Sequence, residues 1–154
     1  PPPLLRLTDA LPLAPDRVTF TEHKATGSSA SPSAPDLASE AALLDYLDTI
    51  PGARERFVWK VFKAGAGSAQ RARARGFKTW VIYYADELAT EPTYLADADL
   101  VGPVYNDTQA AFSIAIATGK PVLSHIITNA AQRDLALGKG ADGFMNSNVT
   151  LLGP

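Results

Sequence analysis

The 154-residue sequence contains no cysteine, which excludes disulfide bonds and metal sites built on thiolates. Its net charge is only −2, so it has no broad basic field, and nucleic acid is not expected as a main partner. It also lacks an apolar run of the length that crosses a bilayer, and we expect no transmembrane segment. With 46% hydrophobic and 19% charged residues, the composition is that of a globular protein with one hydrophobic core. We therefore expect a single domain over residues 1–154.

Six short runs have the composition of buried strands, because they are apolar, partly β-branched and bounded by turn residues. Most of the gaps between them carry helical patterns that begin at capping residues and end at glycine. In the first of these helices, Asp36 is the expected N-cap. The predicted strands cover residues 17–24, 56–62, 77–84, 98–105, 120–128 and 141–147, and the clearest helical patterns cover 36–50, 67–76, 106–119 and 128–138.

Strands that alternate with helices predict a parallel α/β fold, most simply part of a (β/α)8 barrel of the TIM type. A doubly wound open sheet is the competing layout. The sequence "GKGADG" at residues 138–143 matches the glycine fingerprint of dinucleotide-binding sheets, but it ends a helix and opens a strand, the reverse of the required order. Six strand–helix units are too few to close an eight-stranded barrel.

The first predicted strand ends in charged residues. Alternation along a strand places Glu22 and Lys24 on the same face as Val18 and Phe20, which we expect to be buried, and turns His23 toward the helices. Functional groups of parallel α/β folds gather at the carboxyl ends of the strands. A carboxylate there suits a hard divalent cation, and a nearby lysine can neutralise a phosphate. The same pattern also fits a simple ion pair between the two side chains.

The second predicted strand carries two lysines near its end. Alternation allows two arrangements, in which either Lys60 or the set of Trp59 and Lys63 faces inward. An inward lysine could contact an anion, whereas an outward one would be solvated. His125, in the fifth predicted strand, fits a structural role and a catalytic role equally well.

Four segments, taken in order, resemble the glycerophosphodiester phosphodiesterase family: "FTEHK" (20–24), "VWKVF" (58–62), "GKPVLSHIITN" (119–129) and "GADGFMNSNVTLL" (140–152). The first places Glu22 at the family's metal-ligand glutamate and Lys24 at its active-site lysine. The chain departs from the family pattern where Val61 replaces a serine and where Asn146 and Ser147 replace a threonine and an aspartate.

The resemblance implies a TIM barrel that uses Ca²⁺ or Mg²⁺ to cleave glycerophosphodiesters into an alcohol and glycerol 3-phosphate. On this basis Glu22 is the expected metal ligand, Lys24 a catalytic residue and Lys60 a substrate contact. The family's His-Arg pair, Glu-x-Asp motif and second histidine have no counterpart here, so we expect the C-terminal part of such a domain, with six of its eight units. Alternatives are a non-catalytic barrel remnant that binds phosphate or serves as a scaffold, and a different phosphate-handling barrel.

The partners implied by the resemblance are a small-molecule phosphodiester and a divalent metal ion. A barrel that lacks two adjacent strands exposes two sheet edges, so self-association through these edges is also expected. The resemblance and the lack of cysteine favour an extracytoplasmic location. The sequence indicates neither the alcohol of the substrate nor the identity of the metal.

Overall fold

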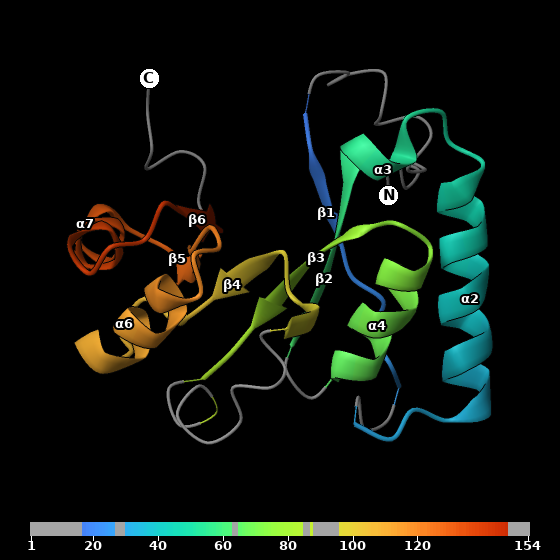
Figure 1. Ribbon diagram of the computed structural model, residues 1–154, viewed down its shortest axis with the longest axis horizontal. Helices are drawn as coiled ribbons and strands as arrows, with labels where there is room; N and C mark the ends of the chain where they lie inside the picture. Colours follow the sequence, from blue (N-terminus) through green and yellow to red (C-terminus); the bar gives the residue numbers. More distant parts are fainter. Residues whose placement is uncertain (1–16, 27–29, 63–64, 85–86, 88–95, 148–154) are drawn as a thin grey trace, which may run out of the picture.

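The computed structural model describes residues 17–26, 30–62, 65–84, 87 and 96–147 of the chain. Within these residues, strands and helices alternate for most of the length (Figure 1). The strands are β1 (Thr19–Thr21), β2 (Phe57–Phe62), β3 (Lys78–Ile82), β4 (Leu100–Gly102), β5 (Leu123–Ile127) and β6 (Gly143–Asn146), and the helices are α2 (Ala34–Asp48), α3 (Ala53–Arg56), α4 (Ala66–Ala74), α6 (Gln109–Ala117) and α7 (Ala130–Gly138).

The six strands are all parallel and follow one another in chain order. Strands β1 to β4 form one sheet and β5 pairs with β6. Two parallel bridges, Val101 to Val122 and Val104 to His125, join β4 to β5. This order has no reversal, whereas a doubly wound sheet requires one, so the described strands follow the barrel-type arrangement. Each predicted strand is present, with ends that lie within three residues of the prediction.

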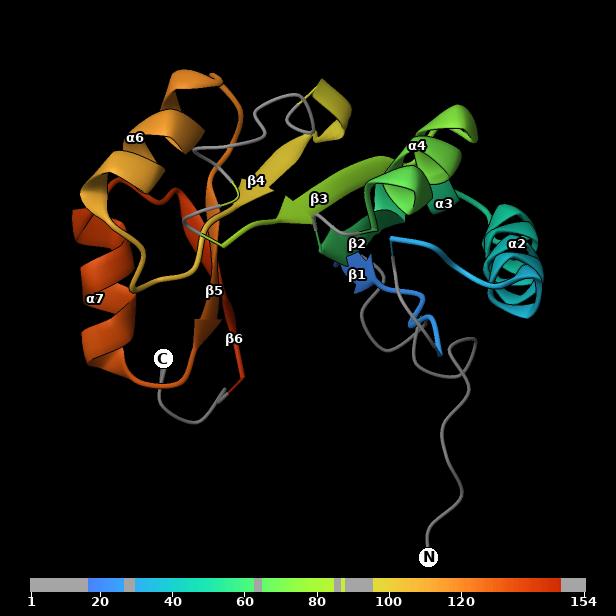
Figure 2. The same cartoon turned by 90° about the horizontal axis from the view of Figure 1, so that it is seen from below.

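The sheet has two faces of different character. In Figure 2 the strands follow a curve from β1 to β6, and α4, α6 and α7 lie on its outer side. We call the side covered by helices the outer face and the opposite side the inner face. The outer face carries the main hydrophobic core, which also receives Leu44 and Leu47 of α2. Its fully buried large side chains include Phe57, Trp59, Val81, Tyr83, Val101 and Phe112.

The inner face at β1 is open. The expectation that Val18 and Phe20 are buried is wrong, because 51% of Val18 and 43% of Phe20 is exposed. Among the described strands β1 pairs only with β2, so it lies at a sheet edge. The Phe20 ring contacts Trp80, at 5.1 Å between ring centroids in an edge-on arrangement. Strand β6 pairs only with β5 among the described strands, so it forms the other edge. Self-association through the two edges stays a prediction, which sedimentation velocity would test.

The N-cap of helix α2 lies three residues before Asp36, the N-cap that the sequence predicted. Ser33 is the N-cap, and its hydroxyl accepts a hydrogen bond from the backbone N–H of Asp36. Asp36 stands at the third helical position and accepts hydrogen bonds from the backbone N–H of Ser33 and of Thr26, at 3.1 and 2.9 Å. This reciprocal arrangement is a capping box. The hydrogen bond from the Thr26 backbone and those from Ser33 hold the pKa of Asp36 well below its usual range.

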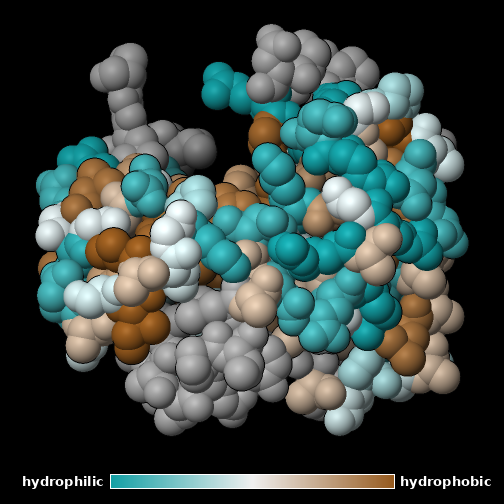
Figure 3. All heavy atoms as spheres, in the orientation of Figure 1, coloured by the Kyte–Doolittle hydropathy of each residue, from teal (hydrophilic) through white to brown (hydrophobic). Residues whose placement is uncertain are grey.

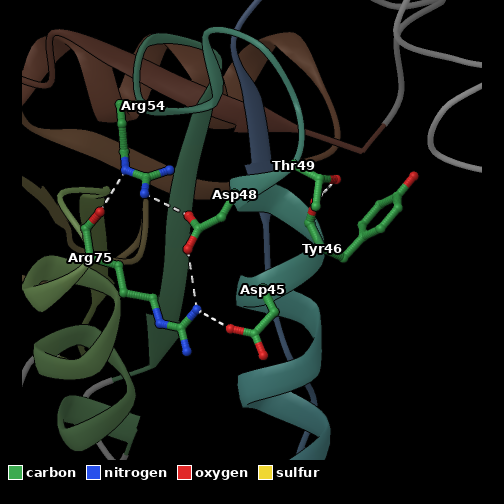
Figure 4. A network of polar contacts seen from close by, with 6 residues as sticks. All are labelled: Asp45, Tyr46, Asp48, Thr49, Arg54 and Arg75. Atoms are coloured by element: carbon green, nitrogen blue, oxygen red, sulfur yellow. Dashed lines mark hydrogen bonds and ion pairs between the residues drawn. The ribbon is translucent and has the colours of Figure 1, made fainter.

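A polar network ties the ends of α2 and α4 to α3 (Figure 4). Arg75, which caps α4, pairs with Asp45 and with Asp48 of α2, the latter at 3.2 Å. Arg54 of α3 pairs with Asp48 at 2.6 Å, and its Nε donates to the backbone carbonyl of Arg75 at 2.5 Å. These contacts fix the loop that leads into β2.

The surface seen in Figure 3 carries hydrophobic patches over α6 and α7, whereas the part over α2 and α4 is mostly hydrophilic. The exposed apolar residues of α6 and α7 are Ile116, Leu135 and Leu137, each exposed by 42–45%. None of the helices in the described residues combines the length and the apolar character that crossing a bilayer requires.

Candidate functional site

The candidate site lies on the inner face, at the carboxyl ends of β1 and β2. Phe20 is paired with Val58, so two residues further along both strands Glu22 stands beside Lys60. Both side chains point to the inner face, because residues that pair across parallel strands share a face. The register thereby settles the question that alternation left open at β2. Lys60 faces inward, and Trp59 faces outward, where its indole N–H donates to Ser68 of α4 at 2.9 Å.

Glu22 is held between two lysines. One carboxylate oxygen lies 2.5 Å from Nζ of Lys60 and the other 3.1 Å from Nζ of Lys24. The first pair is largely buried, with 16% of the glutamate and 14% of the Lys60 side chain exposed, whereas 75% of the Lys24 side chain is exposed. The ion pair between Glu22 and Lys24 that the sequence allowed is therefore present, and a second, more buried lysine shares the same carboxylate.

Aromatic side chains extend this cluster along the inner face. Nζ of Lys60 and of Lys24 lie 5.6 and 5.7 Å from the centroid of the Phe62 ring, within the range of a cation–π contact. The Phe62 ring stacks on Tyr84 at 6.2 Å and meets His125 edge-on at 6.1 Å. The cluster formed by Glu22, Lys24, Lys60, Phe62, Tyr84 and His125 is called the inner rim below.

His125 is the part of the inner rim that sequence reasoning left undecided. It is 3% exposed, and two backbone hydrogen bonds, from its N–H to Pro103 and from the N–H of Tyr105 to its carbonyl, hold it against the segment that follows β4. Burial, together with the nearby positive charge of Lys60, lowers the pKa of the imidazole to about 4, and a hydrogen bond to the Tyr83 backbone partly opposes this shift. The ring is therefore neutral at physiological pH.

Tyr84 and Phe62 were not singled out from the sequence as site residues. The alternation of Trp80, Ile82 and Tyr84 is visible in the sequence, but only the pairing of Trp80 with Lys60 shows that they share the face of that lysine. Gly102 of β4 completes this layer. A methyl group there would lie 2.5 Å from Nε1 of Trp80, so only glycine leaves room for the indole.

The described residues do not by themselves fit a hard divalent cation. Both oxygens of Glu22 are bound to ammonium groups, and the described part of the chain holds no group of three or more His, Asp or Glu side chains that could bind a metal. Calcium takes roughly six to eight oxygen ligands and magnesium an octahedron. A cation at Glu22 would need further ligands and would compete with Lys60.

Other polar residues near this end of the sheet make contacts with the helices of the outer face. His23 faces outward as predicted, and its Nε2 lies 2.7 Å from the hydroxyl of Ser39 on α2. Glu40 of α2 is buried and makes two hydrogen bonds with Arg71 of α4, at 2.5 and 3.1 Å. Lys63 lies outside the described residues, as do Leu151 and Leu152 of the last family-like segment.

Comparison with models of known protein families and with curated proteins found no match. Among solved structures, the chain is similar to a putative glycerophosphoryl diester phosphodiesterase from Silicibacter pomeroyi DSS-3, with a TM-score of 0.56 and 16% sequence identity. The match covers 85% of this chain and 47% of the other, so the chain spans about half the length of that phosphodiesterase. At this identity the likeness shows a shared parallel α/β fold, and it agrees with the resemblance that the sequence motifs indicated.

Proposed function

We propose that Lys24 and Lys60 of the inner rim bind the phosphate group of a phosphodiester, and that in a complete barrel this site serves the hydrolysis of glycerophosphodiesters to an alcohol and glycerol 3-phosphate. The observation that carries this proposal is the pair of lysines around Glu22 at the carboxyl ends of two parallel strands. The fold shared with a putative glycerophosphoryl diester phosphodiesterase supports the same reaction class.

In this proposal Lys60 and Lys24 neutralise the phosphate oxygens. Hydrolysis forms a bond from a water oxygen to phosphorus and breaks the bond from phosphorus to the alkoxy oxygen, which leaves with a proton as the alcohol. Negative charge on the phosphoryl oxygens is stabilised by positive groups already in place, and Lys24 would act here as the catalytic lysine. The barrel would need two more strands between β6 and β1.

Glu22 would contribute one ligand to a Ca²⁺ or Mg²⁺ ion in that complete barrel. Because the described residues supply no further ligand set, the cation depends on groups beyond them. This role stays a proposal, and the phosphate-binding role of the lysines does not require it.

The second candidate is a barrel remnant that binds phosphate without cleaving it. It is favoured by the state of Glu22, whose two oxygens are already paired, and by His125, which is neutral and buried and so offers no ready acid. Both candidates share the lysine site and differ in the cation and in turnover.

Calorimetric titration of the 154-residue chain with glycerol 3-phosphate tests the shared part. We expect binding that Lys60→Met weakens about tenfold or more, since a charge-assisted contact to phosphate contributes roughly 1.5–3 kcal/mol. Lys78→Met is the matched control, because Lys78 is exposed at the amino end of β3, away from the rim. Equal binding by wild type and Lys60→Met would contradict the lysine site.

The same titration with Ca²⁺ present separates the two candidates. Tighter binding of glycerol 3-phosphate with Ca²⁺, together with release of glycerol 3-phosphate from glycerophosphocholine, supports the hydrolase. Binding that is indifferent to Ca²⁺, with no release of product, supports the non-catalytic remnant.

A further inference from the structure

We infer that His125, with Phe62 and Tyr84, forms a position that accepts a hydrogen bond from a hydroxyl group of the bound phosphate ester, next to the lysines that bind its phosphate. The inference rests on the proposed function, because it names a further part of the ligand that the same site would take. It concerns a polar atom that has no partner among the residues the structure describes.

The two ring nitrogens of His125 differ in their hydrogen bonds. The side-chain Nε2 of His125 is buried and has no hydrogen-bond partner, within the part of the chain that the structure describes. The ring does hydrogen-bond to the Tyr83 backbone, and the Tyr83 N–H already donates to the carbonyl of Gly102 at 2.9 Å. The ring nitrogen therefore donates to the Tyr83 carbonyl, so Nδ1 carries the proton.

A neutral imidazole has one donor nitrogen and one acceptor nitrogen. When one ring nitrogen is a donor, the other is an acceptor with a free lone pair. Nε2 of His125 thus requires a donor. An anionic phosphate oxygen cannot supply one, but the hydroxyl of an alcohol or polyol can. A buried acceptor without a partner is rare in folded proteins and calls for an explanation.

The Phe62 ring lies next to both this acceptor and the lysines. The Phe62 ring is flanked on one side by Nζ of Lys60 at 5.6 Å and meets the His125 ring at 6.1 Å. Tyr84 is half exposed and its ring lies 6.4 Å from that of His125, so it is the side from which a hydroxyl group of the ligand would reach the imidazole. A ligand with its phosphate on the lysines and a hydroxyl on a neighbouring carbon matches this arrangement, and the aromatic rings would cover its C–H groups.

Two ligands that differ only in hydroxyl groups provide the test. Glycerol 3-phosphate carries hydroxyls, whereas ethyl phosphate has the same charged group and none. We expect wild type to bind glycerol 3-phosphate about fivefold more tightly than ethyl phosphate, the size of one net hydrogen bond. In His125→Leu this preference should vanish while the affinity for ethyl phosphate is kept, and His125→Gln, which restores an acceptor, should recover part of it.

Nitrogen-15 NMR supplies a readout that a merely structural role would not move. The chain has two histidines, and His23, bonded to Ser39 on the outer face, is an internal control. Addition of glycerol 3-phosphate should shift the Nε2 resonance of His125 and leave that of His23 unchanged, and ethyl phosphate should shift neither.

The outcomes are distinguishable. A preference for glycerol 3-phosphate that persists in His125→Leu, or no preference in wild type, overturns the hydroxyl position and leaves the lysine site standing. Absence of binding by both ligands and by inorganic phosphate contradicts the proposed function, and the inference falls with it.

Discussion

The outer and inner faces of this sheet are built from alternate residues of the same strands, yet at β1 and β2 they differ in burial and in charge. On the outer face Phe57 and Trp59 are each 1% exposed beneath helices. On the inner face the neighbouring positions hold Lys60 in an ion pair with Glu22, and Phe20 is 43% exposed. The contrast is largest at β1, where apolar surface stays exposed beside the charged groups of the inner rim, because further along the sheet the inner face has a smaller buried cluster of its own, formed by Val58, Trp80 and Ile82.

The largest effect that tests this comparison comes from one pair of phenylalanines. Phe57→Ala should lower the free energy of unfolding by about 3–5 kcal/mol, because it leaves a cavity in the outer core. Phe20→Ala should cost about 1 kcal/mol, since it removes a half-exposed ring with one edge-on contact to Trp80. Urea denaturation of both variants measures the contrast, and equal costs would mean that something covers the inner face at β1.

One arginine and one lysine substitution compare a buried ion pair of the outer face with an exposed ion pair of the inner rim. Arg71→Ala should destabilise by about 2–3 kcal/mol, because it removes the guanidinium that pairs with the carboxylate of Glu40, which is 5% exposed. Lys24→Ala should change stability by less than about 0.5 kcal/mol, because its ammonium is largely solvated. A substantial loss in Lys24→Ala, measured in the same denaturation assay, would show that the rim contributes to folding.

The pH dependence of stability provides a smaller effect that reports on His125. Its pKa of about 4 in the folded protein lies below the ordinary value of 6.5, so the unfolded chain binds more protons between these values. Stability should therefore be fully present above pH 6.5 and fall as the pH drops toward 4. The free energies of unfolding at pH 7.5 and pH 5 should differ less in His125→Leu than in wild type.

His23→Leu is the control for this measurement. His23 lies on the other face, bonded to Ser39, and its removal should leave the wild-type difference between the two pH values in place. The carboxylate of Asp36 does not interfere, because its pKa is lowered and its contribution to stability is lost only below about pH 4. If the free energy of unfolding of His125→Leu differs between pH 7.5 and pH 5 by as much as that of wild type, a buried neutral imidazole is contradicted.

The positions of the strands could be predicted from the sequence because short β-branched runs between turn residues are a local signal. What depends on neighbours in space could not. The inward direction of Lys60 follows from its pairing with Trp80 and with the strand of Glu22, and the exposure of Val18 and Phe20 follows from the edge position of β1. A single strand shows alternation but does not show which side is covered.

The composition of the inner rim was predicted in part for the same reason. Glu22, Lys24 and Lys60 could be chosen because charged residues at a strand end are conspicuous in an apolar run. Phe62, Tyr84 and His125 come from three different strands or their ends, and only the register of the sheet brings their rings together. The N-cap was missed because Asp36 and Ser33 both have capping side chains, and the two share one capping box.

We propose that the cluster of Glu22, Lys24 and Lys60, which carries one negative and two positive charges, can bind a phosphate in the place of the glutamate. Titration of Glu22→Gln and wild type with glycerol 3-phosphate, without divalent cations, tests it most directly. The substitution removes the internal competitor for both lysines, so we predict binding about tenfold tighter in Glu22→Gln, which corresponds to roughly 1.4 kcal/mol. Binding that is unchanged or weaker in Glu22→Gln would contradict it.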